Sequence, residues 1–312
     1  MLVAETATNA KLETLLARVR KRYPRMSPAY RRLADYFVER PYELAFLSAA
    51  DLGRSLRLSA ATVVRFAESL GLRGYSDLRA ILRAGLRHEF STVVRLERTS
   101  RASGGESLLR RSLGADIANL ERTGELVADP AFQRAVDILS KARVVHFVGL
   151  RSTLGLAHVF SFYLDMIGRP TRVIVPGVGD LVEQLLGVRP EDAGVAISFR
   201  RYTRQTVEVF REVERAGAST VAITDSELSP LAEFADVCLC VGVRFPSFFE
   251  SFVGALGLIN GLLTGIALAR PRETREALRR REAAWAQANT YLDGAFPGGF
   301  RTRVEAFEAI RS

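Results

Sequence analysis

The 312-residue sequence has few side chains that form disulfides or bind metals, with two cysteines and three histidines. Cys238 and Cys240 lie two positions apart, so on a strand they point to the same face, where a mutual disulfide has poor geometry. No histidine lies near them in the sequence to complete a metal site. We therefore assign both cysteines to core packing and expect no metal or other cofactor.

Long apolar runs are also missing. Residues 247–268 come nearest, but they carry Glu250, Asn260 and several glycines, so we predict a buried helix and not a membrane span. The first residues show no basic segment followed by an apolar run, as a secretory signal would. These absences predict a cytoplasmic protein with no membrane partner.

Lysine is scarce, and the positive charge is unevenly distributed. Arginine supplies all but 3 of the 44 basic residues. Residues 1–112 hold 21 Lys and Arg against 11 Asp and Glu, whereas residues 113–312 hold 23 against 24. Because contacts between basic side chains and phosphates supply most non-specific DNA affinity, this distribution favours a DNA-binding module in the N-terminal third.

Residues 48–78 contain the start signals of two short helices. Ser48 and Ser59 each precede a helical pattern and are predicted N-caps. Apolar side chains then fall where the two helices of a helix-turn-helix touch: Leu52, Leu56, Leu58, Val63 and Phe66. A plain helical hairpin, in which these residues are only core, is the alternative.

The second helix would turn small, hydroxylated and cationic side chains outward, and such a face can enter a major groove. Arg57 occupies the turn, where helix-turn-helix units often carry glycine, so we expect it in the left-handed conformation at some cost. The predicted DNA-contacting residues are Ser59, Ala61, Thr62, Arg65, Arg73 and Tyr75.

The stretch around these helices resembles the N-terminal domain of the RpiR/MurR family of bacterial transcriptional regulators. The likeness runs from residue 33 to residue 78, and its most specific phrase is Thr-Val-Val-Arg-Phe at residues 62–66. The resemblance implies an all-α helix-turn-helix domain over residues 1–90 that binds double-stranded operator DNA. A linker over residues 91–107 is predicted to follow, because its glycine- and serine-rich part has no apolar periodicity. Its arginines, Arg95, Arg98 and Arg101, could follow the DNA backbone; a solvated hinge is the alternative.

Residues 108–271 alternate helical patterns with short Val/Ile/Ala-rich runs. The predicted strands are 144–148, 172–175, 193–198, 219–224 and 237–241, and the helices between them are predicted at about 153–167, 180–187, 203–216 and 229–235. Such runs between helices favour a five-stranded parallel sheet covered on both faces, that is, an α/β three-layer domain. Residues 272–312 are predicted to form a C-terminal helix and tail.

Two loops of this domain are candidates for ligand binding, because ligands bind beyond the carboxyl ends of parallel strands. Their hydroxyls and arginines would suit an anion; alternatively they are helix caps and surface charges. The candidates are Arg151, Ser152 and Thr153 in the first loop, and Ser198, Arg200, Arg201 and Thr203 in the second.

Residues 149–157, 196–207 and 222–236 resemble a sugar isomerase (SIS) domain, which follows the helix-turn-helix in RpiR/MurR regulators. The family commonly shows Gly-x-Gly-x-Ser in the first loop and Ser-x-Ser-Gly-x-Thr in the second. This chain has arginine at three of those positions: Arg151, Arg200 and Arg201. Glycine lets the backbone approach an anion closely, whereas arginine offers the anion bidentate contacts from its side chain. We therefore expect a small anionic effector, either a sugar phosphate or a smaller, more acidic metabolite.

Catalysis has little support in the sequence. An aldose-ketose isomerase needs a general base, and only Glu250 and His158 could lie near the two loops. We predict no catalytic residue and count Glu250 among the effector-binding residues. A sugar-phosphate isomerase or lyase with a regulatory helical domain is the alternative function, and a dimerisation scaffold is a further one.

The apolar segment over residues 247–270 carries glycines at helical spacing, which lets a helix pack closely within its own core or across a two-fold axis. A protein that reads paired half-sites also needs two copies of its DNA-binding domain. We therefore expect a homodimer or tetramer. The sequence as a whole predicts a transcriptional regulator that senses a small anion and thereby changes its binding to operator DNA.

Overall fold

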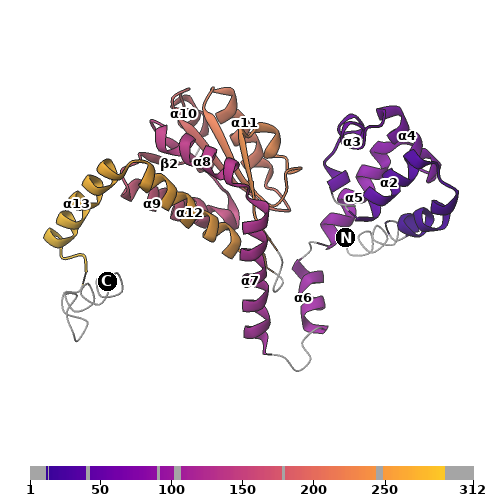
Figure 1. Cartoon of the computed structure of the whole chain (residues 1–312), viewed down its shortest axis with the longest axis horizontal. Helices are drawn as coiled ribbons and strands as arrows, with labels where there is room; N and C mark the ends of the chain where they lie inside the picture. Colours follow the sequence, from indigo (N-terminus) through magenta and orange to yellow (C-terminus); the bar gives the residue numbers. More distant parts are fainter. Residues whose placement is uncertain are drawn as a thin grey trace.

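The computed structural model describes residue 12 and residues 14–39, 43–89, 92–101, 107–177, 180–243 and 249–291. A smaller helical N-terminal part, up to residue 101, is followed by a larger part with an α/β architecture (Figure 1). We call them the helical, or DNA-binding, half and the α/β half. The predicted tail beyond residue 291, the glycine-containing stretch 102–106 and the predicted start of the long helix at residue 247 lie outside the described residues.

The N-terminal half is all-α, as predicted. Residues 14–22 are helical and are followed by η1 (Tyr23–Arg25), α2 (Pro28–Glu39), η2 (Glu43–Ala45), α3 (Ala49–Ser55), α4 (Ala60–Ser69) and α5 (Tyr75–Glu89). These elements share one apolar core, in which Phe37, Phe66 and Leu70 are buried. Each side chain of that size contributes about 1.5–3 kcal/mol by its removal from water.

Helices α3 and α4 form the predicted helix-turn-helix. Ser48 caps α3 in a reciprocal arrangement with Asp51, and the Ser59 hydroxyl accepts a hydrogen bond from the backbone N–H of Thr62 at the start of α4. Arg57 has a φ of 53°, the left-handed conformation expected for the turn. The two serine caps and the strained turn together fix where one helix ends and the next begins.

Gly53 lets the two helices approach each other closely. It is buried in α3, and a β-carbon at this position would lie 2.7 Å from the carbonyl oxygen of Leu58 and 3.3 Å from the backbone nitrogen of Ala60. Both neighbours are backbone atoms, which cannot rotate away. The helix-turn-helix geometry therefore depends on the absence of a side chain at this position.

The predicted linker contains a helix, α6 (Thr92–Arg101). Arg95, interpreted from the sequence as a DNA-backbone contact or a solvated residue, is instead buried and 8% exposed. The side chains of Arg98 and Arg101 lie outside what the structure describes. The sequence did not predict α6 as a helix, because α6 buries a charged residue and exposes two apolar ones, Val93 and Leu96.

Five strands of the described chain form one parallel sheet in the order β2-β1-β3-β4-β5. They are β1 (Val145–Val148), β2 (Thr171–Val173), β3 (Ala193–Ile197), β4 (Ser219–Thr224) and β5 (Val237–Cys240). All pairings are parallel, with Val145 opposite Thr171 on one side and Ala193 on the other. Both cysteines of β5 are free. The five predicted strands are therefore confirmed to within a residue or two.

Helices cover both faces of the sheet, as predicted for a three-layer domain. Phe147, Val195 and Ile223 point to the face that packs on α8 (Asp129–Lys141), α9 (Leu154–Met166) and α12 (Val253–Ala269). The alternate residues Val148, Ala196 and Ala222 point to the face covered by α10 (Leu181–Leu186) and α11 (Arg204–Arg215). This alternation follows from the two-residue period of a strand. A predicted helix at residues 229–235 is only a short 3-10 turn, η4 (Ala232–Phe234).

Helix α12 packs within its own domain through the glycines. A β-carbon at Gly254 would lie 2.6 Å from the hydroxyl of Thr123 in α7 (Leu108–Leu126), and one at Gly265 would lie 2.8 Å from Val136 in α8. The helix begins at Val253, later than predicted, so Glu250 precedes it and does not open it. The last described helix is α13 (Pro271–Gln287).

No single helix in the described part of the chain is long and apolar enough to cross a membrane. The pair α12 and α13 meets the length and composition requirement only when taken together, and it is bent by 107° at its break.

Replacement of Gly53 by alanine tests the helix-turn-helix packing. We expect Gly53→Ala to lower the free energy of unfolding of the N-terminal half by about 1–3 kcal/mol, because the new methyl group overlaps backbone atoms. Gly114→Ala in α7 is the matched control: a methyl group added there has open space for 4 Å around it, so alanine should stabilise α7 by up to about 1 kcal/mol. Urea titrations followed by circular dichroism measure both. An equal effect of the two substitutions would contradict the close approach at Gly53.

Candidate functional site

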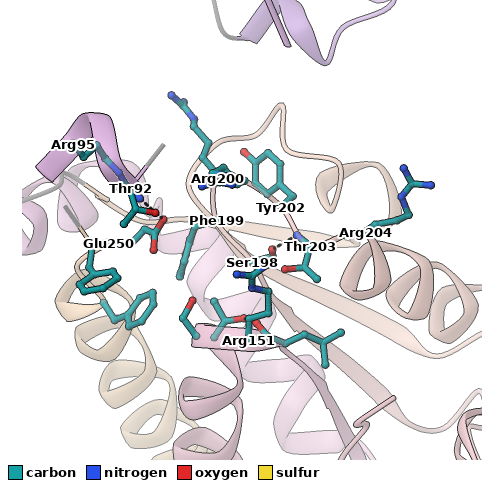
Figure 2. A pocket seen from close by; sticks show the side chains of 16 residues that line it. Thr92, Arg95, Arg151, Ser198, Phe199, Arg200, Tyr202, Thr203, Arg204 and Glu250 are labelled. Atoms are coloured by element: carbon teal, nitrogen blue, oxygen red, sulfur yellow. Dashed lines mark hydrogen bonds and ion pairs between the residues drawn. The ribbon is translucent and has the colours of Figure 1, made fainter. Parts of the chain in front are cut away.

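A cavity of about 530 Å³ opens beyond the carboxyl ends of β1 and β3 (Figure 2). Four segments that are distant in the sequence supply its walls: α6, the β1–α9 loop, the β3–α11 loop and the segment before α12. The lining residues are Thr92, Arg95, Leu150, Arg151, Ser152, Thr153, Ser198, Phe199, Arg200, Arg201, Tyr202, Thr203, Arg204, Phe249, Glu250 and Phe252. All eight residues predicted to bind an effector are among them. His158, the other candidate base, is exposed on α9 and is not among the lining residues.

The hydroxyl groups of the two loops do not serve as helix caps. Thr153 and Thr203 stand at the N-cap positions of α9 and α11, yet neither side chain makes a capping bond. Instead, the Thr153 hydroxyl donates to the carbonyl oxygen of Leu150 at 3.0 Å, and the Ser198 hydroxyl accepts from the backbone N–H of Thr203 at 3.4 Å. These bonds shape the loops and leave the helix N-termini facing the cavity (Figure 2).

A buried carboxylate, Asp225, holds the β3–α11 loop in place. It follows β4 and accepts a 2.8 Å hydrogen bond from the hydroxyl of Tyr202, and the guanidinium of Arg200 lies 2.8 Å from its other oxygen. Burial raises the pKa of Asp225, and the nearby Arg200 charge acts in the opposite direction. Burial also raises the pKa of Tyr202, which therefore stays a hydrogen-bond donor at neutral pH. Arg200, which the sequence predicted as an anion ligand, thus forms an ion pair with Asp225.

Both loops keep a glycine-like backbone at positions occupied by arginine. Arg151 has a φ of 59° and Arg201 a φ of 41°. The SIS pattern has glycine at both of these positions, and its remaining glycine is kept as Gly149. The left-handed conformation costs a non-glycine residue about 1–2 kcal/mol, and such strain is typical of binding sites.

The cavity carries a large excess of positive charge. Among the described residues, five arginines line it, against one acidic residue, Glu250. The Glu250 carboxylate is 3.6 Å from the Arg95 guanidinium, and both side chains are largely buried. Burial lowers the pKa of Arg95, whereas Glu250 acts to raise it. Figure 2 shows Arg204 pointing away from the other labelled side chains, so it contributes charge more than contact. The arrangement attracts anions.

Sequence reasoning missed several residues that line the cavity or hold its loops in place. Asp225 lies within a phrase already assigned to the SIS pattern, and its place after β4, next to β3, could have identified it as a partner of the β3–α11 loop. Thr92 and Arg95 gave no such signal, because α6 lies far from the other segments in the sequence. The aromatic side chains of Phe249 and Phe252 were seen only as part of an apolar helix.

The second predicted site is the outward face of α4. Ser59, Ala61 and Arg65 are exposed and Thr62 is half-buried, whereas Val63 and Phe66 face the core. The exposed face of α4 thus carries small and cationic side chains, which a major groove accepts, and these side chains point outward as predicted.

Of the two further residues predicted to contact DNA, one is exposed and the other is buried. Arg73 is exposed, with its guanidinium 2.9 Å from Asp77. Tyr75 is a correction: it is 4% exposed, and its hydroxyl donates to the carbonyl oxygens of Leu44 and Leu47 at 3.2 and 3.3 Å. Burial raises its pKa. Its hydroxyl stabilises the helical core, so it cannot reach a DNA phosphate.

Paired substitutions test the strained backbone of the pocket. We expect Arg201→Gly to be more stable than Arg201→Ala by about 1 kcal/mol, because only glycine adopts positive φ without steric cost. At Arg204, in the first turn of α11, the order should reverse, because alanine is the better helix former. Chemical denaturation of the four variants measures both differences. Arg201→Ala being as stable as Arg201→Gly would contradict the left-handed conformation.

Comparison with known protein families agrees with this architecture. Residues 13–89 match the pattern described as "Helix-turn-helix domain, rpiR family", and residues 138–264 match the SIS domain. The first match covers the helical half up to the end of α5, and the second covers the sheet and its surrounding helices.

Individual proteins show the same combination. The chain is 28% identical over 286 residues to the HTH-type transcriptional regulator HexR of Pseudomonas aeruginosa, covering 86% of this chain and 94% of that protein. It is 30% identical to the sugar isomerase domain of an RpiR transcription factor from Sphaerobacter thermophilus, with a TM-score of 0.55, covering 57% of this chain and 99% of that one. Vibrio vulnificus NanR, solved with ManNAc-6P, is 21% identical and shares the fold, with a TM-score of 0.59 over 88% of this chain and 98% of that one. The chain therefore belongs to the RpiR family of helix-turn-helix transcriptional regulators with a SIS domain.

Proposed function

We propose that the arginine-rich cavity of this DNA-binding regulator binds a phosphorylated sugar or another small anionic metabolite and thereby changes the affinity for operator DNA. One observation carries the proposal: in the described part of the chain, five arginines and the N-termini of two helices surround the cavity, and the one acidic residue that lines it is already paired with an arginine. Helix N-termini and guanidinium groups both stabilise bound phosphate or carboxylate.

The site supports a particular division of roles. Arg151 and Arg201 are exposed at the cavity and are the cations best placed to meet an anionic group. The hydroxyl of Ser152 and the backbone N–H groups of the two loops would supply further donors. Vibrio vulnificus NanR binds an amino-sugar phosphate on the same fold, which supports a sugar phosphate for this chain as well.

The cavity can bind a sugar phosphate without catalysing its reaction. A catalytic role for Glu250 would require a carboxylate free to take a proton from the sugar, and here it faces Arg95 at 3.6 Å. Regulation needs only that the effector bind more tightly to one conformation of the protein than to another. We propose sensing, with no turnover.

We also propose that the regulator acts as a homodimer or tetramer in the cytoplasm. Helix α7 supports this, because it exposes apolar side chains along one stretch: Leu108, Leu109, Leu113 and Ile117 are each more than half exposed. Apolar surface of this kind is typical of an interface between copies. Two copies would present two α4 helices to the half-sites of an operator.

A thermal-melting panel tests the effector. The compounds are glucose 6-phosphate, N-acetylmannosamine 6-phosphate, 6-phosphogluconate, citrate and inorganic phosphate. An effector at about 100-fold its Kd should raise the melting temperature by several degrees, because it stabilises the folded state by about 2.7 kcal/mol. In the double variant Arg151→Met with Arg201→Met, the Kd should rise at least about tenfold through lost charge-assisted hydrogen bonds.

Arg279→Met is the control for this panel, because Arg279 is an exposed arginine of α13, outside both the cavity and the apolar stretch of α7. Its melting shifts should match those of the wild type. If no compound shifts the melting temperature, the proposed effector class is wrong and the sheet domain is better described as a scaffold. If an aldose or ketose phosphate is converted, and Glu250→Gln abolishes the conversion, the isomerase or lyase alternative is correct.

The DNA-reading face is tested with operator sites selected from random duplexes. If Arg65 reads a base, Arg65→Ala should weaken binding by about 1–3 kcal/mol at a single base pair and relax the preference there. Arg73→Ala should weaken binding to all duplexes about equally, because a phosphate contact carries no sequence information. Gel-shift titrations at fixed salt give both values. A uniform loss for Arg65→Ala would contradict base reading.

A further inference from the structure

The wall of the effector cavity is completed by the helix that leaves the DNA-binding half. Helix α6 starts directly after α5 and places Thr92 and Arg95 in the lining, opposite the loops of the sheet domain. Figure 2 shows Arg95 extending from α6 toward Glu250, whose carboxylate it approaches at 3.6 Å. The cavity therefore contains a cation that belongs to neither of the two SIS loops.

The DNA-binding half touches the cavity walls at a second place. The ring of Phe46, which follows η2, contacts the ring of Tyr202 edge-on, with 5.4 Å between the ring centroids. Tyr202 belongs to the β3–α11 loop and is hydrogen-bonded to Asp225. Changes in the cavity can thus reach the helical half both through α6 and through this aromatic contact.

The ion pair between Arg95 and Glu250 is weak enough for a bound anion to replace Glu250 as the partner of Arg95. Its 3.6 Å separation is longer than the 2.7–2.9 Å of a strong charge-assisted hydrogen bond. A phosphate offers a guanidinium two acceptor oxygens and more charge than one carboxylate does. An anion entering the cavity is repelled by Glu250 and attracted by Arg95, so it competes directly with the carboxylate for the arginine.

Apolar packing holds α6 only weakly. Among its described side chains, Val93 is 59% exposed, Leu96 is 46% exposed and Val94 is half-buried. Segments with little apolar burial are the ones whose position a bound ligand can most easily change. The interactions of Arg95 should therefore have a large influence on where α6 lies.

We infer that Arg95 is an effector-binding residue supplied by α6, which exchanges Glu250 for the anionic group of the effector and so makes the position of α6 depend on occupancy of the cavity. The inference rests on the proposed effector function of the same cavity. It names the residue through which binding is transmitted to the DNA-binding half, and it assigns Glu250 the role of a competing anion in the empty state.

The experiment combines calorimetry with hydrogen exchange on the full chain. Wild type, Arg95→Met, Arg95→Lys and Glu250→Gln are titrated with glucose 6-phosphate, N-acetylmannosamine 6-phosphate, 6-phosphogluconate, citrate and inorganic phosphate. Amide exchange of residues 92–101 is followed with and without each compound that binds. Arg279→Met serves as the matched control for loss of a positive charge, and the melting temperature of each unliganded variant shows that it is folded.

We expect the Kd to rise at least about tenfold in Arg95→Met and less in Arg95→Lys, which keeps the charge but not the bidentate geometry. Glu250→Gln should bind inorganic phosphate more tightly than the wild type, because the competing carboxylate is gone. Ligand should slow exchange in α6 in the wild type and Arg279→Met but not in Arg95→Met.

Unchanged affinity in a folded Arg95→Met, or weaker phosphate binding by Glu250→Gln, would overturn the inference while leaving the proposed effector function in place. Absence of binding by the wild type to every compound would instead contradict the proposed function itself, and the inference with it. The two failures are therefore distinguishable.

Discussion

The buried carboxylate of Asp225 is the constraint on which the cavity depends. It is 8% exposed at the end of β4, and a charge so far from water is tolerated only with a charged or hydrogen-bonding partner. Arg200 and Tyr202 supply those partners from the neighbouring loop, and in doing so they fix the course of the chain between β3 and α11. The loop then presents Arg201 and the N-terminus of α11 to the cavity.

The two SIS-type loops preserve the backbone of a glycine-rich phosphate loop while changing its chemistry. At Arg151 and Arg201 the chain adopts positive φ, which a side chain makes costly. A strained position keeps a large cationic residue only if that residue contributes something glycine cannot. What arginine adds to the cavity is positive charge, which would compensate the proposed anion for a less close approach of backbone N–H groups.

The connection between the two halves is more than a tether. A helix lies where the sequence predicted a structureless linker, and it buries Arg95 in the wall of the cavity. Phe46 adds a second contact, on the loop that Asp225 holds. The cavity and the helical half are thus joined by side chains, which is the kind of physical connection that linkage between two sites requires.

The sequence by itself determined the order and type of nearly all the elements, the helix-turn-helix with its caps at Ser48 and Ser59, and the two loops that face the cavity. These features are encoded by short-range patterns: hydrophobic period, capping residues and turn chemistry. Only the tertiary structure decided which polar side chains meet. It paired Arg200 with Asp225, buried Tyr75 in the helical core, and brought Arg95 to Glu250. Such pairings join residues far apart in the chain, and a local pattern carries no information about them, because burial and distance arise only when the elements pack.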